Sequence, residues 1–114
     1  MPILVTNLEN GATRVILSDR IDAAGAVEIS MPMYYVGESS DSVIIDLAKV
    51  SFLASLGLRN IVALAKSVYK RKGKVVLLSP QPFVEEVLTT SGITDLIPVY
   101  RTQASAETAV LLAD

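Results

Sequence analysis

The sequence predicts an α/β fold with a mixed central sheet of about five strands and about four helices, forming one domain over residues 1–114. Short apolar runs alternate with longer segments whose apolar residues recur every three or four positions, as strands alternate with amphipathic helices. Of the 114 residues, 51% are hydrophobic and 19% are charged, so the chain is long and apolar enough to bury one core. These observations favour a sheet with helices packed on it.

Two strands are expected at the start of the chain. The runs ILVTNL and TRVILS are separated by ENGA, in which Asn10 and Gly11 form a dipeptide typical of tight hairpin turns. We therefore expect the two strands to pair antiparallel and to be neighbours in the sheet.

The first helix should begin after Asp22. This residue precedes the run AAGAVEI, and its carboxylate can accept a backbone N–H while opposing the positive end of the helix dipole. Pro32 lies further along the same pattern. A proline inside a helix removes one hydrogen bond and clashes with the preceding turn, so we expect a kink or break near Ser30 and Met31.

A central strand and a long helix follow. The run VIIDL is apolar and rich in β-branched residues, as expected for a strand buried on both faces and ending in Asp46 and Leu47. From Ser55 onward the apolar residues recur at helical spacing until the segment KRKG. Gly73 stands where a left-handed residue commonly ends a helix, and the cations of residues 70–72 complement its dipole. The KRKG cluster thus has a structural explanation beside a binding role.

The rest of the chain predicts two more strands and two more helices. KVVLLS is typical of a buried strand, and QPFVEEVLTTSG of a short helix with Pro82 in its first turn and Gly92 past its end. LIPVY should be a short edge strand, because Pro98 cannot donate to a neighbouring strand. TQASAETAVLLA should be a last helix capped by Thr102 or Ser105. Its apolar side comprises Ala106, Ala109, Val110 and Ala113.

Composition excludes several classes of function. The chain has no cysteine and no histidine, which removes thiolate catalysis, the commonest general base and the commonest metal ligand. It has no glycine-rich phosphate loop, no nucleophile elbow and no carboxylate cluster at metal-ligand spacing, so we expect no cofactor and no metal. The acids Asp22 and Asp46 could approach each other, but such lone pairs usually have structural roles.

Charge and hydropathy narrow the partners and the location. The net charge of −2 gives no general attraction for nucleic acid. No apolar stretch reaches the ~18 residues of a membrane span, and no basic segment precedes an apolar one at the start. We therefore expect a cytoplasmic protein with no membrane span and no nucleic-acid partner.

The segment from residue 43 to residue 100 resembles the core of a STAS domain, the fold of bacterial anti-sigma factor antagonists. The similarity lies in the strand ending in Asp46 and Leu47, the junction VSFLASLGL, the long helix after it, and the segments LSP and SGITDLIPVY. Upstream, LSDRIDAAGA is similar to the family's second strand and the start of its first helix. The resemblance covers nearly the whole chain.

The resemblance implies a regulatory protein-binding module without catalytic activity. In this family, an anti-sigma factor that is also a serine kinase phosphorylates the serine that matches Ser55. The unphosphorylated domain sequesters the anti-sigma factor, phosphorylation releases it, and a serine phosphatase resets the switch. Family members often have an aspartate before this serine and a small hydroxyl residue after it, where this chain has Ala54 and Leu56.

The residues themselves leave two roles open for Ser55. As the N-cap of the long helix, its hydroxyl would accept a hydrogen bond from the N–H of Gly57 or Leu58. As a phosphorylation site, it would carry a phosphate over free N–H groups at the positive end of the helix dipole. Since the loops after the second and third strands should emerge at the same sheet edge, we expect a partner-binding surface there. It comprises Arg20, Asp22, Ala54, Ser55, Leu56, Gly57 and Arg59.

Two other functions remain open at the level of the sequence. The domain could be an interaction module of another signalling or lipid-trafficking complex, in which Ser55 is not phosphorylated. Some members of the wider family bind nucleotides, so a nucleotide or small-molecule sensor is a further alternative.

Overall fold

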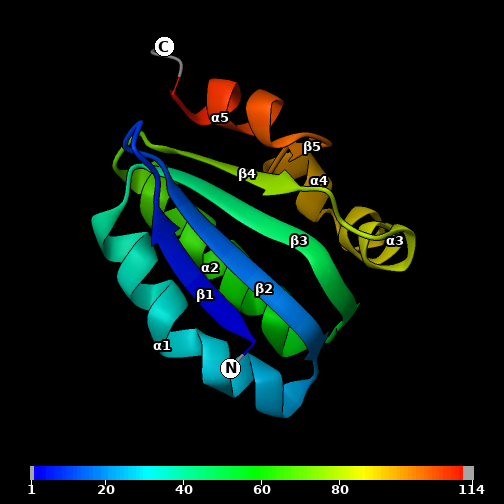
Figure 1. Cartoon of the computed structure of the whole chain (residues 1–114). Helices are drawn as coiled ribbons and strands as arrows, with labels where there is room; N and C mark the ends of the chain where they lie inside the picture. The colour runs from blue at the N-terminus through cyan, green and yellow to red at the C-terminus, as the bar shows by residue number, and fades with distance from the viewer. Residues whose placement is uncertain (1, 112–114) are drawn as a thin grey trace.

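The computed structural model describes residues 2–111 and contains a five-stranded sheet with the strand order β1-β2-β3-β4-β5 (Figure 1). The strands are β1 (Ile3–Asn7), β2 (Thr13–Ile21), β3 (Ser42–Leu53), β4 (Lys74–Leu78) and β5 (Val99–Tyr100). The helices are α1 (Ala23–Ser39), α2 (Ser55–Lys70), α3 (Pro82–Thr90), α4 (Ile93–Leu96) and α5 (Gln103–Leu111). The predicted fold class is confirmed, and the short helix α4 is an additional element between α3 and β5.

The sheet is mixed because only β1 runs against its neighbour. β1 and β2 form the predicted antiparallel hairpin, in which Gly11 has a φ of +95° and Asn10 Oδ1 accepts a hydrogen bond from the Ala12 N–H at 3.1 Å. β2, β3, β4 and β5 are parallel to one another. The hairpin prediction is therefore confirmed.

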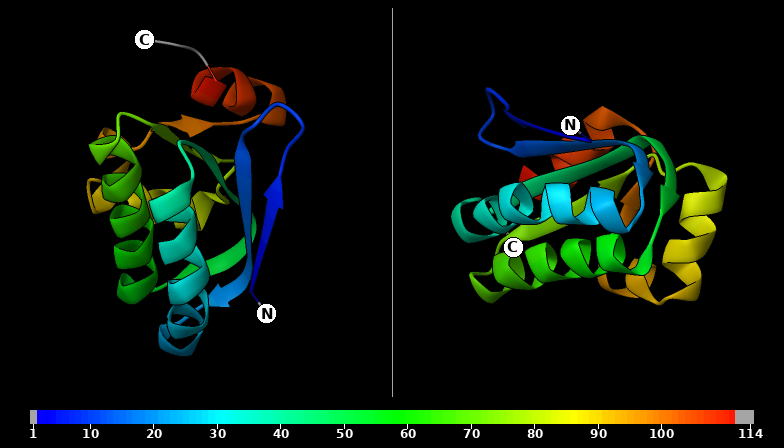
Figure 2. Two further views of the ribbon diagram at one scale, coloured as in Figure 1. Left: turned by 90° about the vertical axis from the view of Figure 1, so that its left-hand side faces the viewer. Right: turned by 90° about the horizontal axis from the view of Figure 1, so that it is seen from below.

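Helices cover both faces of the sheet. α1 and α2 lie side by side on one face, as right-handed connections between parallel strands require (Figure 2). α5 covers part of the other face, where Ala106 and Val110 pack against Ile44, Val76 and Leu78 (Figure 2). None of the helices within residues 2–111 is long and apolar enough to cross a membrane.

α1 runs from Ala23 to Ser39 with Pro32 inside it, so of the predicted kink or break near Ser30 and Met31 the break is wrong and the kink stays a prediction. Proline removes only its own N–H from the helical ladder. The buried side chains of Ile29 and Met33 on either side of it hold the helix on the sheet. Tertiary packing therefore overrides the local preference of Pro32.

β3 extends well beyond the end that the sequence predicts. The apolar run stops at Leu47, but the strand continues to Leu53 and pairs with the far end of β2. Two irregularities in the pairing interrupt the alternation of side chains, so that Ala48 and Lys49 are both exposed. The extension brings the end of β3 next to the end of β2.

The end of α2 differs from the prediction. Lys72, and not Gly73, has the left-handed conformation, with a φ of +66°. Gly73 is required for a different reason: a Cβ atom there would lie 2.5 Å from the carbonyl oxygen of Asp41. The glycine lets the chain leaving α2 pass close to the start of β3.

Arg71, at the end of α2, forms hydrogen bonds with the end of α1. Its guanidinium donates hydrogen bonds to the carbonyl oxygens of Gly37 at 2.7 Å and Ser40 at 2.6 Å, and it pairs with Asp41 at 3.2 Å. These carbonyls lie at the negative end of the α1 dipole. The KRKG cluster therefore has a structural role, because Arg71 links α2 to the neighbouring helix α1.

The C-terminal third follows the sequence prediction closely. Pro82 lies in the first turn of α3, Gly92 has a φ of +83° past its end, and β5 is a two-residue edge strand after Pro98. Thr102 is the residue that caps α5, because its Oγ1 accepts the Ser105 N–H at 3.1 Å. Of the predicted apolar side of this helix, Ala106 and Val110 are buried, Ala109 is partly buried, and Ala113 lies outside the described residues.

An ion pair joins α3 to the segment after β5. Arg101 donates to the carboxylate of Glu85 at 2.5 Å. This hydrogen bond lowers the pKa of Glu85 from its usual value. The pair is exposed and makes only a small contribution to stability.

The turn after α2 predicts opposite effects for two neighbouring substitutions. Gly73→Ala should lower the free energy of unfolding by about 1–3 kcal/mol, because the new Cβ meets the Asp41 carbonyl. Lys72→Gly should raise it by up to about 1 kcal/mol, because glycine tolerates a positive φ. Urea unfolding of both variants measures the effects. Equal destabilisation by the two substitutions would contradict this assignment.

Arg71→Gln should lower the free energy of unfolding by about 1 kcal/mol, because the carbonyls at the end of α1 lose a charged donor that is partly screened by solvent. Lys70→Gln is the matched control on the same turn and should change stability by less than about 0.5 kcal/mol. Thermal melts of the two variants compare them directly. A control as destabilised as Arg71→Gln would show that charge alone, and not the hydrogen bonds, accounts for the effect.

Candidate functional site

The candidate site is built where β2 and β3 end together. Arg20 pairs with Phe52 and Ile21 with Leu53 in the parallel ladder. The N–H of Ala54 donates to the carbonyl oxygen of Ile21 at 2.8 Å, one residue before α2 begins and two residues before α1 begins. The first residues of α1 and α2 therefore start side by side at one edge of the sheet.

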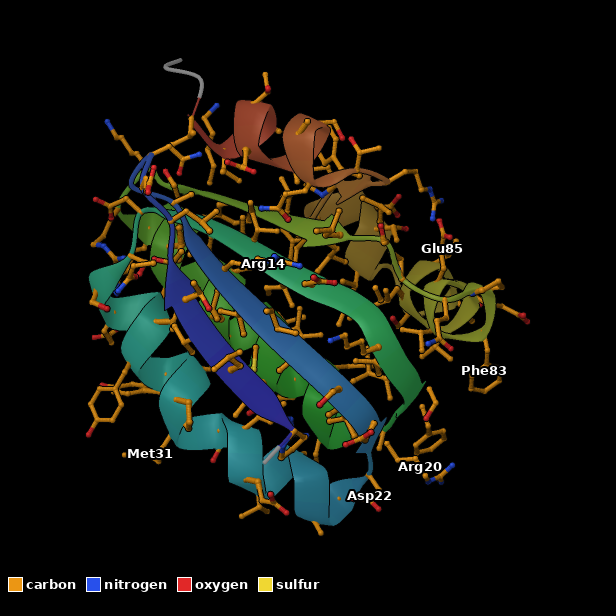
Figure 3. All side chains as sticks on the ribbon, viewed as in Figure 1. Arg14, Arg20, Asp22, Met31, Phe83 and Glu85 are labelled. Atoms are coloured by element: carbon orange, nitrogen blue, oxygen red, sulfur yellow. The ribbon has the colours of Figure 1, made fainter. Side chains whose placement is uncertain are left out.

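Asp22 has the structural role that the sequence predicts. Its Oδ1 accepts a hydrogen bond from the N–H of Gly25 at 2.9 Å and so caps α1. The same glycine lies close to the strand, since a Cβ atom on it would be 3.0 Å from the Arg20 carbonyl. Asp22 is exposed and lies at the start of α1, next to Arg20 (Figure 3).

Ser55 is the first residue of α2 and not its N-cap. Ala54 occupies the cap position, with an extended backbone at φ −81° and ψ 166°, and no side chain caps the helix. The cap prediction for Ser55 is therefore wrong. The hydrogen bond from Ala54 to β2 keeps that residue extended and delays the helix by one position. As a result, the exposed hydroxyl of Ser55 is not used to hold the helix end.

Gly57 lies beneath this surface. A Cβ atom on it would be 2.8 Å from both Ile21 Cγ2 and Leu53 Cδ1, so only glycine lets the first turn of α2 approach the sheet this closely. It is buried, whereas Ser55 and Leu56 on the same turn are exposed. Gly57 thus sets the height of Ser55 above the sheet and offers no side chain to a partner.

Arg20 is held in place across the strand pair. Its guanidinium carbon lies 4.4 Å from the centre of the Phe52 ring, within the range of a cation–π interaction. The side chain remains exposed. The sequence analysis missed Phe52 because it ended the third strand at Leu47; the junction VSFLASLGL was the signal that could have identified it.

A hollow of about 160 Å³ lies between the two helices and is lined by Leu56, the residue after Ser55. Its lining residues come from the first two turns of α1 and α2: Ala26, Val27, Ser30, Leu56, Arg59 and Asn60. Asn60 also closes its base, since its Nδ2 donates to the carbonyl oxygen of Ala26 at 2.9 Å. Of the residues expected at the site, Arg20, Asp22, Ser55, Leu56 and Arg59 are exposed, Ala54 is half-buried and Gly57 is buried.

Asp22 and Asp46 do not form a catalytic pair. Asp46 is buried on β3. It accepts two hydrogen bonds from the Arg14 guanidinium, at 2.6 Å and 3.2 Å, and a third from the Ala48 N–H at 3.0 Å. Asp22 is occupied as a helix cap. Both acids therefore have structural roles, as the sequence analysis favoured.

Comparison with known families agrees with this architecture. A family model of the STAS domain matches residues 7–106. The chain belongs to the STAS domain family. The match includes both strand ends of the candidate site and the whole of α1 and α2.

This STAS domain is similar to anti-sigma factor antagonists of several bacteria. BtrV of Bordetella bronchiseptica, described as a candidate anti-sigma factor antagonist, is 31% identical over 74 residues; the match covers 65% of this chain and 64% of BtrV, slightly less than two thirds. An anti-sigma factor antagonist from Mycobacterium paratuberculosis is 28% identical, with a TM-score of 0.83 over 95% of this chain and 92% of that one. The phosphorylated form of the Bacillus cell fate determinant SpoIIAA is 17% identical and shares the fold, with a TM-score of 0.74 over 95% of this chain and 98% of that one.

The cap geometry predicts that two similar substitutions in this STAS domain differ in stability. Asp22→Ala should lower the free energy of unfolding by about 1 kcal/mol, because α1 loses its cap. Ser55→Ala should change it by less than about 0.5 kcal/mol, because the hydroxyl caps nothing. Urea unfolding measures both variants. A loss of about 1 kcal/mol in Ser55→Ala would restore the N-cap role.

Proposed function

We propose that this STAS domain is a non-catalytic anti-sigma factor antagonist that acts in the bacterial cytoplasm. It sequesters an anti-sigma factor through the surface around Ser55 and releases it when that factor, acting as a serine kinase, phosphorylates Ser55. A serine phosphatase resets the switch. The proposed contact surface comprises Arg20, Asp22, Ala54, Ser55, Leu56 and Arg59, with Gly57 beneath it.

The observation that carries the proposal is the exposed hydroxyl of Ser55 at the start of α2, where the fold does not use it. A phosphate on this oxygen would add about −1.5 to −2 charges next to the uncapped N–H groups and the positive end of the helix dipole. The fold can therefore accept the phosphate. A partner seated over Leu56 and the adjoining hollow would instead meet a desolvated charge, which favours its release.

The named relatives support the same function. Two of them are described as anti-sigma factor antagonists, and a solved structure with this fold is a phosphorylated form. Ala54 replaces the acid that often precedes the serine in the family. This exchange removes a side-chain cap from α2 and a negative charge from the approach of a kinase, while the hydroxyl stays exposed.

Binding should separate the switch from a purely structural role of Ser55. Ser55→Asp should weaken binding of the anti-sigma factor by about tenfold or more, whereas Ser55→Ala should bind like the wild type and become insensitive to ATP. Ala104→Asp is the matched control, because it adds an exposed carboxylate to the first turn of α5 on the other face of the sheet. Calorimetric titration against the purified anti-sigma factors of the source genome measures these affinities.

Mass spectrometry after incubation with the bound anti-sigma factor and ATP completes the test. The wild type should gain one phosphate at Ser55, and Ser55→Ala should gain none. If Ser55→Asp binds as tightly as the wild type and no phosphate is added, the proposed switch is wrong.

A further inference from the structure

α1 exposes a ridge of large apolar side chains that the fold does not use. Val27, Met31 and Tyr34 are 69%, 57% and 57% exposed, and their spacing of four and three residues places them along one side of the helix. The opposite side, with Ile29 and Met33, is buried against the sheet. Contiguous exposed apolar side chains of this kind mark interaction surfaces.

The ridge borders a groove between α1 and α2. The groove has a volume of about 400 Å³, and small or polar side chains make up most of its α2 side. Its lining includes Ser30, Met31 and Tyr34 of α1 and Asn60, Ala63 and Ser67 of α2. Ala63 and Ser67 have small side chains, so the larger apolar side chains of α1 form the more prominent wall of the groove.

The groove is continuous with the candidate site. Ser30 and Asn60 line both the groove and the hollow beside Ser55. Figure 3 shows Met31, which lines the groove, on the outer side of α1, and Asp22 at the start of the same helix. A protein that contacts the surface around Ser55 can therefore extend directly into the groove.

Three cations that flank the groove on its α2 side, without lining it, indicate the charge of what it binds. Arg59, Lys66 and Lys70 are exposed on α2 at a spacing of seven and four residues, so they follow the same outer side of the helix as Ala63. A helical segment in the groove would face these cations along one flank. Acidic side chains on that flank complement them.

We propose that an amphipathic helix of the anti-sigma factor, apolar on one side and acidic along one flank, docks in the groove between α1 and α2. This proposal rests on the proposed function and adds a second contact region beyond Ser55. The groove gives affinity by burying the ridge on α1, and the cations of α2 fix the orientation of the bound helix. Phosphorylation at Ser55 acts at one end of this contact.

Substitutions on α1 test the groove. Tyr34→Ala should weaken binding of the anti-sigma factor by about tenfold. Tyr35→Ala is the matched control: Tyr35 is 61% exposed and adjacent to Tyr34, but it does not line the groove, so its affinity should stay within about twofold of the wild type. Lys66→Glu should also weaken binding, and Lys49→Glu, exposed on β3, should not. Equal effects of Tyr34→Ala and Tyr35→Ala would overturn the proposal.

The outcomes distinguish this proposal from the proposed function. If Ser55→Asp weakens binding and Tyr34→Ala does not, the switch stands and the groove proposal is wrong. If none of the anti-sigma factors binds the wild type, the proposed function fails. The groove is then tested with an amphipathic peptide of about 18 residues that has leucines on one side and glutamates on one flank. The groove proposal is supported if the peptide binds, if Tyr34→Ala weakens this binding, and if a peptide with lysines in place of the glutamates does not bind. No binding, or a dimer of this chain that Tyr34→Ala dissociates, overturns it.

Discussion

The parallel pairing of the ends of β2 and β3 is the constraint on which the rest of the structure depends. The Ala54 N–H is bonded to the Ile21 carbonyl at 2.8 Å, and this bond brings two strand-to-helix junctions to one place. Buried side chains of Ile21 and Leu53 lie beneath it, and Gly57 allows α2 to close down on them. Without this pairing, Ser55 would have no fixed relation to Asp22 or Arg20, and α1 and α2 would not form a common surface.

The two helices that start at this point differ in how their N-terminal N–H groups are capped, and this difference bears on function. Asp22 caps α1 with its own carboxylate, so that end has a satisfied N–H and a fixed negative charge. α2 starts without a side-chain cap, and the hydroxyl at its first residue remains exposed. An uncapped helix end costs some stability, but it leaves donors and a positive potential where an added phosphate can sit. A carboxylate that caps its helix and a hydroxyl that caps nothing thus lie at the starts of neighbouring helices.

Local signals in the sequence predicted most of the elements. The dipeptide of Asn10 and Gly11, the carboxylate of Asp22 and the proline at position 98 each act within a few residues, and the structure confirms these predictions.

The features that the sequence did not predict depend on contacts between distant segments. The length of β3 follows from its pairing with β2, and irregularities in that pairing hide the alternation of side chains. Gly73 is needed because the Asp41 carbonyl lies against it, and Arg71 binds carbonyl groups of α1; neither contact can be read from the local pattern. At the site, the sequence predicted the strand-to-helix junction that contains Ser55. It did not predict that Ser55 is the first helical residue and not the N-cap, because this shift depends on the bond between Ala54 and Ile21.

The central claim is that a phosphate on Ser55 changes the charge of the surface around it and leaves the backbone fold unchanged. Amide NMR spectra of the chain with phosphoserine placed at position 55 during synthesis, compared with those of the unmodified chain, test this claim most directly. We expect shifts confined to the ends of β2 and β3 and to the first turns of α1 and α2, with an unchanged melting temperature within a few degrees. Shifts that spread through β4, α3 and α5, or a large loss of stability, would show that the phosphate acts by disrupting the fold and would contradict the account.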